Sequence, residues 1–179
     1  QGGHPLRLLH LPRQRLMTEH PEEVSSHSSP ASRHPVTART KARRRAIEIL
    51  FEADQRGMLS SEGSEELRSF AQLRAVSSAN HTEAPAYTRE ILDGLCDHLG
   101  DVDETIQTYA QGWTLGRMPA VDRAIARVAT WEIVYNDEVD APVAVDEAMT
   151  LSRMLSTDES PRYLGGLLGR IGDLADTLR

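Results

Sequence analysis

The stretch that decides the fold reads Pro119-Ala-Val-Asp-Arg-Ala-Ile-Ala-Arg-Val-Ala-Thr-Trp-Glu-Ile-Val-Tyr135. Its apolar residues recur at the spacing of an α-helix, and its proline occupies a helix start, where a missing N–H costs little. One face carries Ile125 and Val128, and another carries the i, i+4 pair Trp131 and Tyr135. Two interpretations stay open: a helix that is central on all sides, or one that offers its aromatic face to a protein partner.

Helical periodicity continues on both sides of this stretch, from Thr37 onward. No segment alternates with a period of two, and the four prolines beyond residue 35 all fall at predicted helix starts. The sequence therefore predicts an all-α bundle of seven helices. They are roughly Ala38–Arg56, Glu65–Ala75, one after Thr82 with Pro85 in its first turn, one from Asp101, one from near Pro119, one from near Pro142 and one from Ser160.

The 179 residues carry a formal net charge of −7, but this charge is divided unevenly along the chain. Residues 1–45 hold nine basic and three acidic side chains, a balance of +6. Residues 46–179 hold 11 basic and 24 acidic side chains, a balance of −13. An acidic body alone would argue against a nucleic-acid partner, but local potential governs binding more than net charge does.

The first 36 residues differ in composition from the rest. They contain five of the nine prolines, five of the seven histidines and no aromatic residue. Such a segment buries too little apolar surface to offset the entropy of ordering it. We therefore expect a disordered leader at residues 1–36 and a helical domain at residues 37–179. The histidine spacing matches no metal-ligand pattern. We hypothesise that translation starts at Met17.

Several classes of function are excluded by what the sequence lacks. No window approaches 18 consecutive apolar residues, and the N-terminal region has no apolar run typical of a secretory signal. The lone cysteine, Cys96, cannot form an internal disulfide, so we expect a reducing, cytoplasmic location. We find no phosphate-binding glycine loop, metal-ligand cluster or acid–base pair. We therefore expect a protein that is not an enzyme and that uses no cofactor or metal.

The clearest local signal is a run of cations, Arg39-Thr-Lys41-Ala-Arg43-Arg44-Arg45, where the leader meets the first helix. Guanidinium groups match the geometry of phosphates. Cations at a helix N-terminus also oppose the helix dipole, so their presence there indicates a use other than helix stability. Contact with a nucleic acid and a merely solubilising junction both stay open as interpretations.

A second signal is Tyr163, beside Arg162 in the first turn of the last predicted helix. An exposed aromatic ring next to a cation suits stacking on a base and contact with its phosphate. The alternative is that Tyr163 belongs to the core, with Leu164 and Leu167.

Taken together, several stretches resemble the NusB family of bacterial transcription antitermination factors. They span about residues 38–175, in the order and spacing of that family. The stretches are Lys41-Ala-Arg-Arg-Arg45 with Leu50-Phe51, Trp113-Thr-Leu-Gly-Arg117, Val121-Asp-Arg-Ala-Ile-Ala-Arg127 with Trp131-Glu132, Pro142-Val-Ala-Val-Asp-Glu-Ala148 with Leu151-Ser-Arg153, and Tyr163-Leu-Gly-Gly-Leu-Leu168.

The resemblance implies seven helices in two packed subdomains, and a role in transcription. NusB-like proteins bind the boxA element of nascent transcripts, such as ribosomal RNA, together with NusE, a small-subunit ribosomal protein. The complex joins the elongating RNA polymerase and suppresses termination. By the same resemblance, RNA would be bound by Lys41, Arg43, Arg44, Arg45, Arg162 and Tyr163, and NusE would be met by Trp131, Glu132, Tyr135 and Glu159.

The chain departs from the family pattern at Gly165, where the family usually has asparagine after Phe-Val. This change removes a hydrogen-bonding side chain beside the predicted RNA site. The alternative function is that of a helical scaffold or interaction protein that forms homodimers, as some NusB relatives do, without binding RNA directly.

Overall fold

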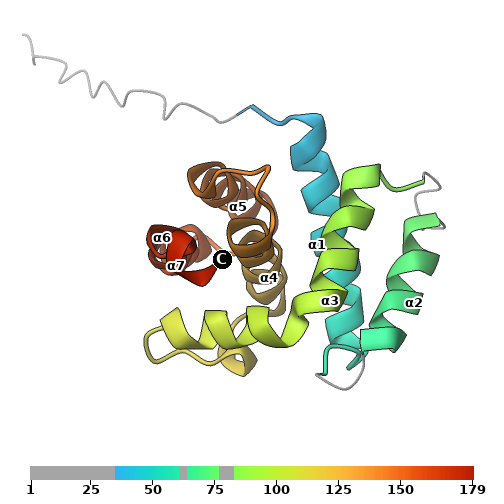
Figure 1. The fold of residues 1–179 in the computed structure, drawn as a ribbon, viewed down its shortest axis with the longest axis horizontal. Helices are drawn as coiled ribbons and strands as arrows, with labels where there is room; N and C mark the ends of the chain where they lie inside the picture. The colour runs from blue at the N-terminus through green and yellow to red at the C-terminus, as the bar shows by residue number, and fades with distance from the viewer. Residues whose placement is uncertain (1–34, 61–63, 77–82) are drawn as a thin grey trace, which may run out of the picture. The chain divides into compact units, whose positions relative to one another are not determined.

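The computed structural model describes residues 35–60, 64–76 and 83–179, and among these residues every regular element is helical. All of these described residues belong to one compact unit. Figure 1 shows its helices, which are α1 (Ala38–Gln55), α2 (Ser64–Val76), α3 (Ala86–Tyr109), the short 3₁₀ helix η1 (Leu115–Arg117), α4 (Ala120–Tyr135), α5 (Ala141–Leu155), α6 (Ser160–Asp173) and α7 (Ala175–Leu178). The predicted all-α class is confirmed. The predicted leader at residues 1–36 lies outside the described residues, except for Pro35 and Val36.

Most helix starts agree with the prediction, but two predicted helices are in fact one. A single helix, α3, runs through Gly100 and Asp101, where the sequence analysis placed a new helix start. Val102 and Ile106 continue the buried stripe that Ile91 begins, because these positions share one face at 3.6 residues per turn. Figure 1 shows that the helix changes direction along its length. The seventh helix is instead the short α7 at the C-terminus, which was not predicted.

The central element is α4, which is buried from Ala124 through Val134 without a break. It packs against α1, α3, α5 and α6. In Figure 1, α1, α2 and the first half of α3 lie to one side of α4, while α5, α6 and α7 lie to the other, and the second half of α3 runs past the end of α4 toward them. This arrangement matches the two packed groups of helices that the family resemblance implies. Of the two interpretations of this stretch, the fully central helix is therefore the correct one.

A buried carboxylate on α4 ties three helices together. Glu132 accepts hydrogen bonds from Arg43 of α1, with Nε 2.8 Å from Oε1 and 3.0 Å from Oε2, and Nη2 2.8 Å from Oε2. It also accepts one from the hydroxyl of Tyr87 of α3 at 2.7 Å. Arg43 also lies 3.5 Å from Glu147 of α5, which accepts a bond from the Thr40 hydroxyl at 3.1 Å. Because an unpaired buried charge is costly, this network fixes the positions of the helices that supply it.

Other polar side chains of α4 each fix a different neighbour. Arg123 donates to Asp54 of α1 at 2.9 Å and to the carbonyl group of Met118 at 2.6 Å. Arg127 forms a two-pronged bond with Asp103 of α3, with distances of 2.8 and 3.1 Å. Together these contacts hold the end of α1, the second half of α3 and the residue after η1 against the central helix.

The junction between α5 and α6 is held in the same way. The buried Asp122 carboxylate accepts bonds from the hydroxyl groups of Ser156 and Ser160, the second at 2.9 Å. Ser160 is the first residue of α6, so the start of that helix is anchored to α4.

Trp131 fills a space that only glycine leaves open on α3. A Cβ atom added to Gly94 would overlap the indole ring of Trp131. The ring is buried, with 5% of its surface exposed. The glycine therefore permits a close approach of α3 to α4 that any side chain would prevent.

The lone cysteine also lies in this core. Cys96 is buried, and burial raises the pKa of its thiol to about 11. A thiol with such a pKa is almost wholly protonated at neutral pH, so it packs as a small apolar group rather than reacting as a thiolate.

None of the described helices has the length and apolar content that crossing a membrane requires.

We predict that Gly94→Ala destabilises the fold by about 1–3 kcal/mol or more, because the added methyl group displaces a buried indole. The matched control is Gly100→Ala in the same helix, where an added Cβ meets nothing within 4 Å. That change should be neutral or stabilise by about 0.5–1 kcal/mol. Urea unfolding followed by circular dichroism measures both, and equal stabilities of the two variants would contradict the packing described.

We also predict that neighbouring arginines differ sharply in their contribution to stability. Arg43→Met leaves the Glu132 carboxylate buried without its cation, which should cost about 3–5 kcal/mol. Arg44→Met removes only an exposed pair with Glu48 and should cost less than about 1 kcal/mol. The same unfolding measurement applies, and an Arg43 variant as stable as the Arg44 variant would show that the buried pair does not hold the helices.

Candidate nucleic-acid interface

The basic run is mounted on a well-defined helix start. The Thr37 hydroxyl accepts a bond from the backbone N–H of Thr40 at 3.2 Å, and the Thr40 hydroxyl accepts one from the backbone N–H of Thr37 at 3.1 Å. This reciprocal capping box fixes the start of α1, with Thr37 as its N-cap. The directions of the cations that follow are therefore set by the helix.

Three of the cations point outward. Lys41 is exposed and forms no ion pair with a described residue. Arg44 is exposed and pairs at 2.9 Å with Glu48, one turn along the helix. Arg39 is exposed as well, and its guanidinium lies 3.9 Å from the centre of the Tyr87 ring. Arg45 is half-buried and donates to the carbonyl group of Arg74 at 3.4 Å.

Arg43 is placed differently, and the expectation that it grips RNA phosphates needs correction. Its side chain has only 4% of its surface exposed and its guanidinium is engaged by Glu132. Because α-helical positions 43, 46, 47 and 50 share one face, Arg43 points into the core with the apolar residues of α1. It cannot touch a phosphate without leaving its buried partner.

Arg162 and Tyr163 lie at a second place, beside the loop between α3 and η1. They line an open hollow of about 710 Å³ together with Trp113, Gly166, Asp158 and Glu159. The rings of Trp113 and Tyr163 have centroids 5.4 Å apart and are inclined at 52°. Arg162 is exposed and forms no ion pair with the residues that the structure describes.

Tyr163 is both a core residue and a surface residue. It packs against the core and is half-buried, while its ring lines the hollow. Its hydroxyl is buried and has no hydrogen-bond partner among the described residues. Burial is the main cause that raises the pKa of this phenol. Tyr163 therefore offers its ring, rather than its hydroxyl, to the hollow.

The predicted partner face is not formed as expected. Trp131 and Glu132 are both interior, the first against Gly94 and the second against Arg43. Tyr135 is half-buried and stacks on His98, with ring centroids 3.9 Å apart. Glu159 is exposed but lies in the hollow beside Trp113, with the residues predicted to bind RNA. The correction follows from the central position of α4, which leaves little of its aromatic face free.

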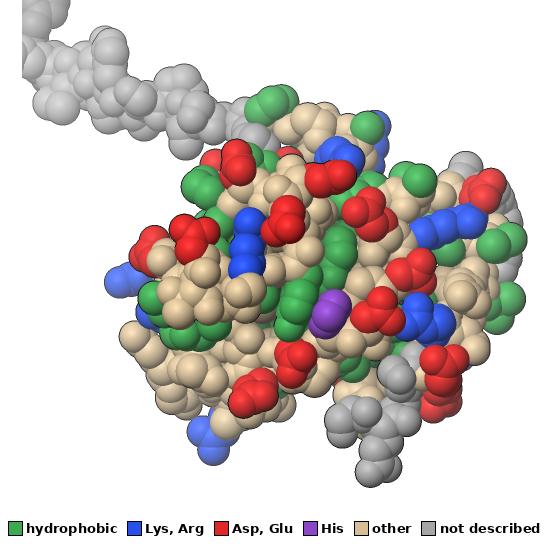
Figure 2. Space-filling model, viewed as in Figure 1, with side chains coloured by type: hydrophobic (Ala, Val, Ile, Leu, Met, Phe, Trp, Pro, Cys, Tyr) green, Lys and Arg blue, Asp and Glu red, His purple; other side chains and the backbone are tan. Residues whose placement is uncertain are grey.

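The two predicted RNA regions are separated in space. In Figure 1 the start of α1 and the loop that precedes η1 lie at opposite ends of the helical unit. Figure 2 shows that Asp and Glu side chains are spread over the face in that view. The exposed cations are therefore local features on an acidic body.

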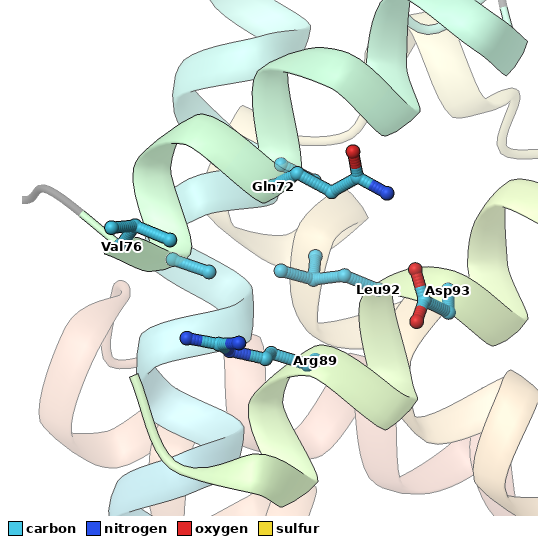
Figure 3. Close-up of a pocket in the computed structure, with 7 residues that line it drawn as sticks. Gln72, Val76, Arg89, Leu92 and Asp93 are labelled. Atoms are coloured by element: carbon cyan, nitrogen blue, oxygen red, sulfur yellow. The ribbon is translucent and has the colours of Figure 1, made fainter. Parts of the chain in front are cut away.

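A smaller hollow of about 270 Å³ lies between α2 and α3 (Figure 3). Apolar side chains such as Val76 and Leu92 line it together with the polar side chains of Gln72, Arg89 and Asp93. Arg89 and Asp93 already form ion pairs, Arg89 with Glu83 and Asp93 with Arg68.

No group of three or more His, Cys, Asp or Glu side chains suited to a metal occurs in the described ranges.

Sequence reasoning missed the position of Trp113. The helical pattern expected from Asp101 placed Trp113 on one face with Ile106 and Tyr109. In the structure α3 ends at Tyr109, and Trp113 is half-exposed, with 51% of its surface accessible. The available signal was Gly112, which precedes it and adopts φ of 89°. A glycine in this left-handed region marks a turn, and a large apolar residue directly after a turn is a candidate for exposure.

Comparison with known proteins agrees with this architecture. The model of the NusB family matches residues 40–173. The transcription antitermination protein NusB of Arthrobacter sp. (strain FB24) is 47% identical over 143 residues, which cover 80% of this chain and 98% of that protein. The structure of T. maritima NusB is 26% identical, with a TM-score of 0.64, and covers 76% of this chain and 92% of its own.

A crystal structure of antitermination factors NusB and NusE in complex with dsRNA includes a chain of the same fold. That chain is 18% identical, with a TM-score of 0.59, and the match covers 76% of this chain and 96% of that one. The helix order, the buried motif residues of α4 and the family match over most of the helical unit lead to one conclusion: the chain belongs to the NusB family.

Proposed function

We propose that this protein is a transcription antitermination factor rather than an enzyme. It binds boxA RNA in nascent transcripts, such as ribosomal RNA, together with NusE, and the complex joins the elongating RNA polymerase. The observation that carries this proposal is the outward set of cations on the first turns of α1, Arg39, Lys41 and Arg44, on an otherwise acidic chain. A relative with 47% identity is named as an antitermination protein, which supports the same function.

Binding begins with the attraction of phosphates to this basic helix start. Arg39, Lys41 and Arg44 are exposed, and Arg162 adds a fourth cation at the distant hollow. Three or four phosphate contacts on single-stranded RNA correspond to a slope of about −2 to −3 for log K against log salt. Such binding is modest by itself, which suits a factor that acts with a second protein.

Arg43 contributes indirectly, by holding α1 in place. Its bond to Glu132 sets the rotation of the helix, and that rotation turns Lys41 and Arg44 toward solvent. A charge reversal at Arg43 is therefore a test of folding rather than of RNA contact, because it would place a third carboxylate beside Glu132 and Glu147.

For NusE, the exposed part of the predicted face is the region of Tyr135 and His98. Their stacked rings form an aromatic surface at the end of α4, and aromatic residues are favoured anchors at protein interfaces. Trp131 and Glu132 support this surface from inside, and Glu159 belongs to the separate hollow.

We predict that the double change Lys41→Ala with Arg44→Ala weakens binding to a boxA oligonucleotide about 10-fold or more at moderate salt. Two lost phosphate contacts should reduce the magnitude of the salt slope by about 1.4. Fluorescence anisotropy at several salt concentrations, with and without NusE, measures both quantities.

The matched control is Arg56→Ala, at the other end of the same helix. Arg56 forms an exposed i, i+4 pair with Glu52 at 3.0 Å, as Arg44 does with Glu48. Its loss should leave both affinity and slope unchanged. A double variant with the wild-type salt slope would mean that the start of α1 does not contact RNA.

A further inference from the structure

We infer that Trp113 is a further RNA-binding residue, on which one unpaired base stacks in the hollow where Arg162 and Tyr163 lie. The inference rests on the proposed RNA-binding function and adds a residue to it. The hollow is open, has a volume of about 710 Å³, and is built from the α3–η1 loop on one side and the first turns of α6 on the other.

The shape of the loop keeps the indole of Trp113 at the surface. Gln111 adopts φ of 48° and Gly112 adopts φ of 89°, so two successive residues lie in the left-handed region. This conformation is unfavourable for glutamine and is found mainly where the surrounding structure imposes it. Arg170 of α6 fixes the first residues of the loop, because it donates two hydrogen bonds to the Tyr109 carbonyl group, at 3.1 and 2.8 Å.

The indole of Trp113 offers one flat face to a base, and the two aromatic rings do not form a slot that a base could enter. With centroids 5.4 Å apart and an inclination of 52°, the rings of Trp113 and Tyr163 contact each other and leave no space for a base between them. Tyr163 is half-buried and supports the indole from below, whereas 51% of the Trp113 surface is exposed. A base can therefore cover Trp113, and every base has the π-face that such stacking needs.

The charges around the hollow favour a base inside it and a phosphate at its edge. The carboxylates of Asp158 and Glu159 repel phosphate, but a base carries no charge. Arg170 is engaged by the Tyr109 carbonyl, while Arg162 is exposed and forms no ion pair with a described residue. The phosphate that follows the base would therefore lie near Arg162. A peptide segment of a protein partner is the competing occupant, and the experiment below separates the two.

Gly166 provides a way to fill the hollow without disturbing the core. It lines the hollow on α6, and an added Cβ would meet only the Nη1 atom of Arg170, at 3.4 Å. Gly166→Leu should therefore keep the fold and occupy the space of the base.

The test measures binding of a boxA oligonucleotide to the full chain and to variants that carry Trp113→Ala, Trp113→Phe or Gly166→Leu. Trp113→Ala should weaken binding about 5- to 100-fold, the range for the loss of one base–aromatic stack. The affinity of the Trp113→Phe variant for RNA should lie between those of the Trp113→Ala variant and the wild-type protein. Gly166→Leu should weaken binding as well. The control Met154→Ala removes another half-exposed apolar side chain, on α5, and should have no effect.

Two further readouts make the test specific. RNA should quench the fluorescence of wild-type protein but not that of the Trp113→Phe variant, whose remaining Trp131 is buried. Each nucleotide of the RNA is also replaced in turn by an abasic one. At one position the effects of the lost base and of Trp113→Ala on the binding free energy should not add, because both changes remove the same stack.

The outcomes distinguish this inference from the proposed function. If Trp113→Ala binds RNA like wild type while Lys41→Ala with Arg44→Ala is weakened, the inference is wrong and the RNA function stands. If Trp113→Ala loses affinity only for NusE, the hollow receives a protein segment and the inference is again wrong. If wild-type protein binds no RNA, with or without NusE, both proposals fail.

Discussion

The Glu132 carboxylate is the constraint on which the rest of the structure depends. A buried negative charge must find partners, and Glu132 finds them on α1 and α3, at Arg43 and Tyr87. Hydrophobic packing alone would tolerate several rotations of α1, because burial of apolar area has no direction. A two-pronged guanidinium–carboxylate bond is directional and forms only when the two planar groups are aligned. The pair therefore sets the rotation of α1, and with it the outward direction of Lys41 and Arg44.

The same logic applies along the whole of α4. The other residues of this helix are mainly apolar, and its four polar side chains pair with neighbours on α1, on α3 and at the start of α6. They are Asp122, Arg123, Arg127 and Glu132. The apolar residues provide the driving force for packing, and the polar residues specify which helix lies where.

Much of the fold was readable from the sequence, because prolines and caps mark helix starts directly. Thr37, Pro119 and Pro142 each lie at or beside the start of an observed helix. The break predicted at Asp101 was wrong, since an acidic residue after glycine resembles a helix start although the buried stripe continues through it. The chain's membership of the NusB family followed from the motifs and is now shown.

The site was less predictable, because it depends on contacts between residues far apart in the sequence. Helical periodicity places Arg43, rather than Arg44 or Arg45, on the buried face of α1, but nothing local identifies its partner, Glu132, which lies 89 positions away. The exposure of Trp113 depends on a loop whose dihedral angles no periodicity reveals. The sequence does indicate one charged residue within the apolar stripe of each of two helices, Arg43 in α1 and Glu132 in α4. Two opposite charges placed in this way are typical of a buried ion pair.

The central claim is that adjacent arginines have opposite roles, Arg43 inside the protein and Arg44 toward RNA. The most direct measurement is NMR of the arginine Nε–H groups of unmodified protein during titration with a boxA oligonucleotide. The account predicts that the Arg43 signal exchanges slowly with solvent and stays unchanged, while the Arg44 signal shifts as RNA is added. A rapidly exchanging Arg43 signal that moves with RNA would contradict it.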